Sequence, residues 1–485
     1  MSFGPNGIAL AIAIPLLAAF LLPIVARLGE AAGRIWGLAA TLVALIIALG
    51  IYGDASTAPQ VTALGGFAPP LGIVLYADTL ASIFLVALVI GVLMFWPRGA
   101  AAGTRAYTLM LVLLAGGSGL VLSGDLFNIY VFYEIVAVAS YGLVASGNSR
   151  ASIAAAARYV ILSAAGSAMA LLGIALVYAA AGTLNLADLA TLSSERLSGP
   201  LGLSAFLLIV IGFGVKAELF PVNSWVPEVY ASAPVPVTAL LAGVVSKLAM
   251  IVILRLLVLV FNTPEALSLL LVLGVLGVIA GELAAYRSGD LKRVFAYSSI
   301  AQLGLVAIAF SIPGEAGVVA GLALALHHLV VKPAFFALTV RWAGPIAGLA
   351  GAIKASPLAA AIFFLMALSI IGVPPLPGFW AKYLLIGGAI ATGSAAYGLA
   401  IAVVLIATVI EAAYLFRIAL VLYRKPAETV APRFKFAELA PGLLLGAVVI
   451  IAAVAVIPLG DGLMAAANEA ADASLYVTRT LGGGQ

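Results

Sequence analysis

Lysines embedded in apolar sequence are the feature of this chain that points most directly to chemistry. The stretch GFGVKAELFPVNSWVPEVYASAPVPVTALLAGVVSKLAMIVILR, residues 212–255, holds Lys216 and Lys247 among apolar residues and four prolines. A lysine charge at the centre of a lipid bilayer costs about 3 kcal/mol on insertion scales. Ionisable groups at that depth usually mark paths for ions, so the stretch predicts ion movement across a membrane.

Glu134 lies midway along the apolar run DLFNIYVFYEIVAVASYGLVA. We interpret it as a proton-binding carboxylate within reach of Lys216, each charge adjusting the proton affinity of the other. A structural ion pair with the same lysine is the alternative, and Lys216 could instead extend to the membrane interface. Glu218 and Glu228 lie nearer the end of their helix, and we expect both to be interfacial.

Further basic groups lie on later apolar runs. Small residues beside Lys247 permit close helix packing that would shield its charge from lipid, whereas Arg255 is expected to extend to the interface. In HHLVVKPAFFAL, His328 and Lys332 are four residues apart and share a helix face, so they form a candidate relay pair. A hydrogen-bonded core histidine is the alternative, and the role of His327 is left open.

Lys382 follows a second proline-rich segment, GVPPLPGFWAK, and Glu411 lies in the run VLIATVIEAAYLFRIAL. The expected neighbour of Glu411 is Lys382 or Arg417, and a plain charge partner would look the same in sequence as a proton carrier. A row of titratable groups joined by water is the pattern of a lateral proton relay. The candidate relay residues are Glu134, Lys216, Lys247, His328, Lys332, Lys382 and Glu411.

The composition places these residues in a polytopic membrane protein. Hydrophobic residues make up 65% of the 485 and charged residues 9%, where a soluble domain carries about 25%. The chain has no cysteine, and its two histidines are adjacent, which argues against iron–sulfur or haem ligation. We therefore expect no cofactor and no metal site, and the formal charge of +4 does not indicate nucleic acid binding.

Hydropathy predicts an all-α fold of about fourteen membrane-spanning helices, of which the seventh and twelfth are broken by prolines. We interpret the first as a retained span, because the residues before it lack the basic flank of a secretory signal. The expected ranges are 8–26, 35–52, 76–95, 107–122, 126–145, 153–180, 201–219, 235–261, 267–286, 294–311, 316–341, 358–390, 399–423 and 439–457.

When the predicted helices cross the membrane in alternating directions, the basic residues are concentrated in the loops on one side of it. The opposite side, with both termini, carries only Arg196 and Arg479, so the positive-inside rule places both ends outside the cytoplasm. The fourth to eighth and the ninth to thirteenth helices form blocks of five that start from opposite sides and would be inverted repeats. The expected segments are 1–105 with three helices, 106–262 and 263–425 with the two repeats, and 426–485 with the last helix and a polar tail.

Five motifs together resemble one family, the antiporter-like subunits shared by respiratory complex I, membrane-bound hydrogenases and Mrp-type cation/proton antiporters. Within that family the chain most resembles the D-type subunit of the Mrp antiporters and its relatives in hydrogenase-like complexes. The motifs are FNIYVFYE around Glu134, the stretch from Lys216 to Lys247, GDLKRVFAYSSIAQLG at 289–304, HHLVVK ending at Lys332, and GVPPLPGFWAK ending at Lys382.

The resemblance implies fourteen helices in inverted five-helix repeats, with a proton channel in each half. It implies that Glu134 pairs with Lys216, that Lys247 is the central lysine and that Lys382 is the terminal one. Partner membrane subunits and a bacterial or archaeal plasma membrane location are implied as well. The family pattern often has a small or different residue at the position of His327, and Glu411 matches no general family position.

The predicted function is that of a proton-translocating subunit of a multi-subunit membrane complex, most like the D-type subunit of a monovalent cation/proton antiporter. It would move H+, with Na+ or another monovalent cation as the coupled ion, while any driving redox reaction would belong to partner subunits. One alternative is a proton-pumping subunit of a complex I-like NADH-quinone oxidoreductase or membrane-bound hydrogenase. The others are a stand-alone secondary transporter and a membrane scaffold whose charges only pair.

Overall fold

A computed structural model describes residues 6–99, 102–425 and 433–482 of the chain. These residues are mainly helical, and eleven of their helices are long and apolar enough to cross a membrane. The described part of the chain is therefore a polytopic helical membrane protein, which confirms that much of the fold prediction. Both termini, whose side of the membrane the sequence predicts, lie outside the described residues.

The chain divides into two compact units. Unit 1 comprises Met1–Ala217, Val244–Leu267 and Ala466–Gln485, and unit 2 comprises Glu218–Gly243 and Ser268–Ala465. Two of the boundaries fall inside the proline-rich stretch 212–255, so Lys216 and Lys247 belong to unit 1, whereas Glu218–Gly243, which lies between them in the sequence, belongs to unit 2.

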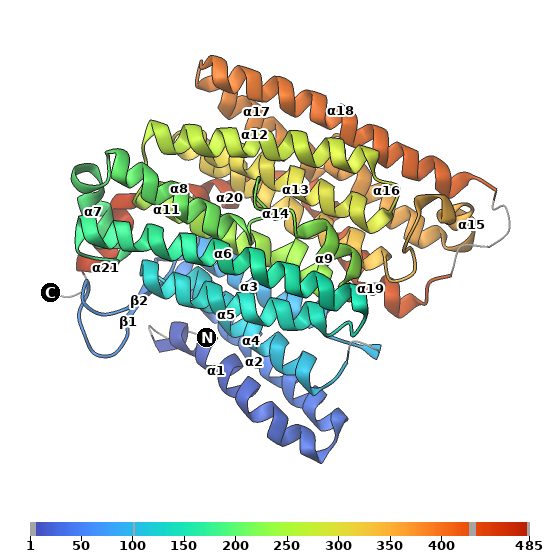
Figure 1. Cartoon of the computed structure of the whole chain (residues 1–485), viewed down its shortest axis with the longest axis horizontal. Helices are drawn as coiled ribbons and strands as arrows, with labels where there is room; N and C mark the ends of the chain where they lie inside the picture. Colours follow the sequence, from blue (N-terminus) through green and yellow to red (C-terminus); the bar gives the residue numbers. More distant parts are fainter. Residues whose placement is uncertain (1–5, 100–101, 426–432, 483–485) are drawn as a thin grey trace. The chain divides into compact units, whose positions relative to one another are not determined.

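In unit 1, long apolar helices such as α4, α5 and α6 lie side by side (Figure 1). The antiparallel pair β1–β2 and the short helix α7 were not predicted from the sequence, because they are shorter than a membrane span. The elements are α1 (Asn6–Val25), α2 (Glu30–Ala55), β1 (Gln60–Ala63), β2 (Val74–Ala77), α3 (Thr79–Met94), α4 (Thr104–Leu122), α5 (Leu126–Ala145), α6 (Arg150–Ala181), α7 (Leu186–Arg196), α8 (Pro200–Gly214), α11 (Ser246–Leu259) and α21 (Ala473–Leu481).

Unit 2 is built around α14, which packs against α13, α16, α17 and α19. The sequence predicts a polar tail after the last helix, which is expected to end at residue 457. The structure instead has helices α20 and α21 over residues 456–481. A π-helical turn, Leu241–Val245, joins α10 to α11. The helices are α9 (Val226–Ser232), α10 (Val235–Leu240), α13 (Leu291–Phe310), α14 (Glu315–Leu338), α15 (Ala352–Ala355), α16 (Pro357–Ile371), α17 (Pro377–Ala391), α18 (Ala395–Tyr423) and α19 (Phe436–Val454), with α12 (Pro264–Arg287) and α20 (Val456–Ala471) shared with unit 1.

Arg255 lies inside unit 1, and the prediction that it extends to the interface is wrong. Its Nη2 atom donates to Asp78 Oδ1 at 2.5 Å, because Asp78 caps the buried start of α3 and supplies a counter-ion there. The guanidinium also lies 5.5 and 5.6 Å from the ring centroids of Tyr76 and Tyr476. Burial raises the pKa of both tyrosines. The cluster thereby fastens α21 to β2, α3 and α11.

Candidate functional site

In unit 1, Lys216 follows the end of α8 and is only 2% exposed. Its Nζ atom donates to the hydroxyls of Tyr159 at 3.1 Å and Ser163 at 3.2 Å, both on α6. The rings of Tyr133, Tyr141 and Tyr159 have their centroids 5.5, 4.8 and 4.3 Å from the same atom. Aromatic faces attract a desolvated ammonium, so these tyrosines and Ser163 stabilise the buried charge.

Glu134 on α5 makes no direct hydrogen bond to Lys216. It bonds to one serine of α6, and Lys216 bonds to another. Ser167 Oγ donates to Glu134 Oε1 at 2.5 Å, and the Tyr130 hydroxyl lies 3.0 Å from the same Oγ. Ser163 and Ser167 are four residues apart on α6 and therefore share a face. The described residues thus do not contain the direct Glu134–Lys216 pair that the resemblance implies, since α6 places two hydroxyls there instead.

Lys247 is fully buried in α11, and its Nζ atom donates to Ser246 Oγ at 3.2 Å. It is the second residue after the π-helical turn, and such turns are frequent at functional sites. Within that turn, Gly243 packs so closely on α14 that a Cβ atom there would come 2.3 Å from Cγ of Pro333. The small residue therefore allows the close helix packing that the sequence indicates.

In unit 2, Lys382 and Glu411 form a buried ion pair with a distance of 2.9 Å between Nζ and Oε2. Gln302 Nε2 donates to the other carboxylate oxygen of Glu411 at 2.8 Å, and Lys382 also donates to Thr408 Oγ1 at 3.2 Å. Of the two neighbours expected for Glu411, the structure selects Lys382. Arg417 donates instead to main-chain carbonyl oxygens at 2.8 and 2.9 Å.

His328 and Lys332 on α14 both face serines of α13. Lys332 Nζ donates to Ser298 Oγ at 2.6 Å, and His328 Nε2 lies 3.5 Å from Ser299 Oγ. The adjacent His327 has a separate partner, because its Nε2 lies 2.9 Å from the Ser369 hydroxyl of α16. The side chains of His328 and Lys332 therefore both lie against serine hydroxyls of α13, whereas His327 lies against a serine of α16.

The prediction that Glu218 is interfacial is wrong, because its side chain is fully buried. The chain turns there through a left-handed conformation, with φ at +57°, and the Tyr230 hydroxyl donates to Glu218 Oε1 at 2.5 Å. The position of Glu218 near a helix end in the sequence does not predict this turn. The side chain of Glu228 is 38% exposed, and its Oε1 lies 3.2 Å from Nη2 of Arg293.

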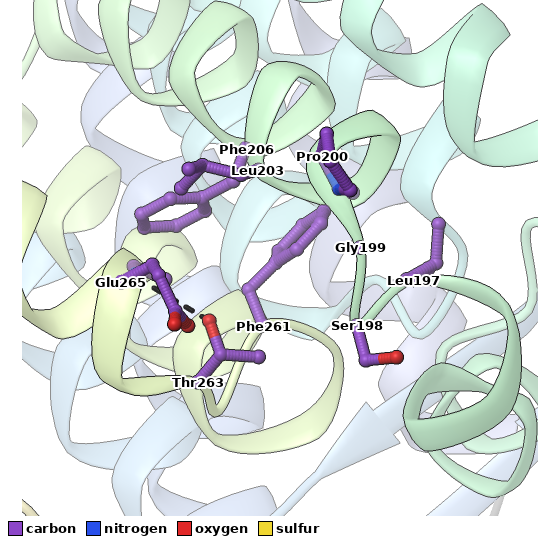
Figure 2. Close-up of a pocket in the computed structure, with 11 residues that line it drawn as sticks. Leu197, Ser198, Gly199, Pro200, Leu203, Phe206, Phe261, Thr263 and Glu265 are labelled. Atoms are coloured by element: carbon purple, nitrogen blue, oxygen red, sulfur yellow. Dashed lines mark hydrogen bonds between the residues drawn. The ribbon is translucent and has the colours of Figure 1, made fainter.

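A pocket of about 230 Å³ lies in unit 1 (Figure 2). Phe206 and Phe261 line it, and Thr263 and Glu265 at the start of α12 face it as well. None of the seven candidate relay residues lines this pocket, so it is no part of the candidate site.

The fold and the buried lysines define a class, that of polytopic membrane proteins whose helices carry titratable side chains within the span. Residues 123–464 match the family described as "NADH:quinone oxidoreductase/Mrp antiporter, TM", and the chain belongs to that family. This confirms the resemblance drawn from the five motifs.

Similar proteins come from more than one kind of complex. The NADH-quinone oxidoreductase N subunit of Desulforudis audaxviator is 34% identical over 430 residues, covering 84% of this chain and 85% of that protein. The Na(+)/H(+) antiporter D-type subunit of Alkalihalophilus pseudofirmus is 33% identical, covering 71% of this chain and 72% of that protein. A chain of the membrane-bound sulfane sulfur reductase, an archaeal respiratory membrane complex, matches with a TM-score of 0.90 and 32% identity, covering 98% of this chain and 99% of that one.

Proposed function

We propose that this chain is a proton-translocating, antiporter-like subunit of a multi-subunit membrane complex, most like the D-type subunit of a monovalent cation/proton antiporter. The observation that carries the proposal is the set of four buried lysines in apolar sequence, none more than 8% exposed: Lys216, Lys247, Lys332 and Lys382. Each donates to a hydroxyl or carboxylate group that can accept or pass on a proton. Such groups at membrane depth support proton movement within each unit.

Fourteen spans in two inverted repeats, with the seventh and twelfth helices broken, belong to the same proposal. The sequence SGDL occurs at 123–126 and again at 288–291, and in each copy the aspartate caps the following helix. The preceding glycine also accepts from a later main-chain N–H in both copies, from Leu186 at 3.0 Å and from Ile346 at 2.9 Å. The end of α8 at Gly214 supports the break proposed for the seventh helix. The end of α16 at Ile371 supports the break proposed for the twelfth.

The same register relates the polar residues of α6 and α14. Ser163 and Ser167 lie 38 and 42 residues after Asp125, and His328 and Lys332 lie 38 and 42 residues after Asp290. The serine pair would therefore be the first-repeat counterpart of the histidine–lysine pair. We further propose the segments 1–105, 106–262, 263–425 and 426–485, a plasma membrane location in a bacterium or archaeon, and both termini outside the cytoplasm.

Removing a hydroxyl between Glu134 and Lys216 is expected to slow proton transport. Ser167→Ala and Ser163→Ala should each lower the rate by about tenfold, because each deletes one hydrogen bond to a charged group. The rate is measured as dye-reported proton flux in vesicles that hold the purified complex. Ser204→Ala is the matched control, since that hydroxyl is exposed and bonds only to its own helix. Unchanged rates in both α6 variants would remove these serines from the pathway.

The proposed function is tested by purifying the chain with its native partners, identifying them by mass spectrometry and reconstituting the complex in vesicles. Proton flux driven by an imposed Na+ or K+ gradient is the expected result. Flux only with an electron donor would favour the redox-driven alternative, which the similarity to the oxidoreductase N subunit and to the sulfane sulfur reductase keeps open. No flux under either condition contradicts proton translocation, and flux by the isolated chain contradicts the role as a subunit.

A further inference from the structure

Glu282 on α12 is a buried carboxylate outside the candidate relay set. Its side chain is 3% exposed within the apolar helix PEALSLLLVLGVLGVIAGELAAYR. Its Oε2 atom has no hydrogen-bond partner among the residues that the structure describes. Buried carboxylates are normally hydrogen-bonded or paired with a cation, so an unpartnered oxygen here calls for an explanation.

Close packing of α12 on α13 brings Glu282 to the ion pair of unit 2. A Cβ atom on Gly281 would come 2.6 Å from the main-chain nitrogen of Ala301, so the two helices touch at their backbones. The residues that follow this contact point are Glu282 on α12 and Gln302 on α13, and Gln302 donates to Glu411. The charged groups that interact electrostatically with Glu282 are Glu411 on α18, Lys382 on α17 and Lys332 on α14.

Tyr414 supplies a hydroxyl in the same place. Its side chain is fully buried, and its hydroxyl makes no close hydrogen bond among the described residues, while the hydrogen-bonding groups that act on it are Ser298 and Glu282. It lies three residues after Glu411 on α18 and so shares that face of the helix. The acidic groups that act on it are Glu282 and Glu411. A phenol that interacts with two carboxyl groups can take a proton from one and give a proton to the other.

We propose that Glu282 is a proton-binding residue that loads the Lys382–Glu411 pair, with the Tyr414 hydroxyl as the connection. The inference rests on the proposed function and adds a residue to it. The Glu282 carboxyl gives its proton to the Tyr414 oxygen, and Tyr414 gives its own hydroxyl proton to Glu411. One proton leaves Glu282, which becomes a carboxylate, and one reaches Glu411, which becomes neutral. Lys382 then faces a neutral acid instead of a counter-ion, which favours release of its own proton.

Glu282→Gln in the reconstituted complex tests this step. We expect proton flux to fall by at least about tenfold, because a group that carries a proton in transit is lost. Tyr414→Phe should also lower the flux, while Glu265→Gln, an exposed change on the same helix, should leave it unchanged. Wild-type flux in the Glu282 variant would overturn this inference but not the proposed function. Absence of flux in the wild-type complex would overturn the proposed function.

An infrared measurement keeps the inference testable if the glutamine variant assembles poorly. Difference spectra of the wild-type complex between two pH values should contain the C=O band of a buried protonated carboxyl group. Glu282→Asp should shift that band, and Glu265→Asp should not. A band that stays in place in the Glu282 variant would show that another group carries the proton.

Discussion

Glu411→Gln is expected to destabilise the protein by about 3–5 kcal/mol, because it leaves the Lys382 ammonium buried without a counter-ion. Glu411 is 1% exposed and holds Lys382 at 2.9 Å, so water cannot replace the lost charge. The change should appear as a lower midpoint of thermal unfolding and a lower yield of assembled complex. A variant as stable as wild type would mean that Lys382 is not charged in the resting protein.

Adding Lys382→Met to Glu411→Gln should recover most of that stability, because an apolar side chain in place of the charge removes the uncompensated group. Proton transport should not recover with it. This double variant separates the two interpretations of the pair that the sequence leaves open. If stability and transport return together, the pair is structural. Lys354→Met, at an exposed position, controls for loss of a lysine in general.

Lys216→Met is expected to lower proton flux by at least about a hundredfold, the scale of losing a positioned proton carrier. Assembly should survive, because the methionine sulfur packs well against aromatic rings such as those of Tyr141 and Tyr159. Both quantities are measured on the same reconstituted preparations, as dye-reported flux and as the fraction of intact complex. A scaffold role predicts the reverse, with assembly lost and the flux per assembled complex unchanged.

The sequence was sufficient to predict the membrane-spanning character and the unusual lysines. A charge in an apolar run is energetically costly, so Lys216, Lys247, Lys332 and Lys382 stand out without any structure. The same reasoning missed Ser163 and the tyrosines around Lys216, because hydroxyl and aromatic side chains are common in membrane helices. Their contacts come from the packing of α5, α6 and α8, which hydropathy does not describe.

One signal in the sequence would have improved the prediction, whereas the position of Glu282 gave no sign of its burial. The repeated SGDL sequence fixes a register in which Ser163 and Ser167 match His328 and Lys332, so the serine pair could have been found by spacing alone. Glu282 lies five residues before Arg287 at the end of its helix, a position typical of interfacial residues. Only the packing of Gly281 against α13 shows that Glu282 is buried.

The most direct test of the claim that buried lysines carry protons is the proton flux of vesicles that contain the intact complex, with wild type measured beside Lys247→Met. Lys247 is fully buried and lies next to the π-helical turn, so its ammonium is held in place inside the protein. We predict rapid flux in the wild type and at least about tenfold less in the variant at equal assembly. Equal flux in the two preparations would contradict proton translocation through these lysines.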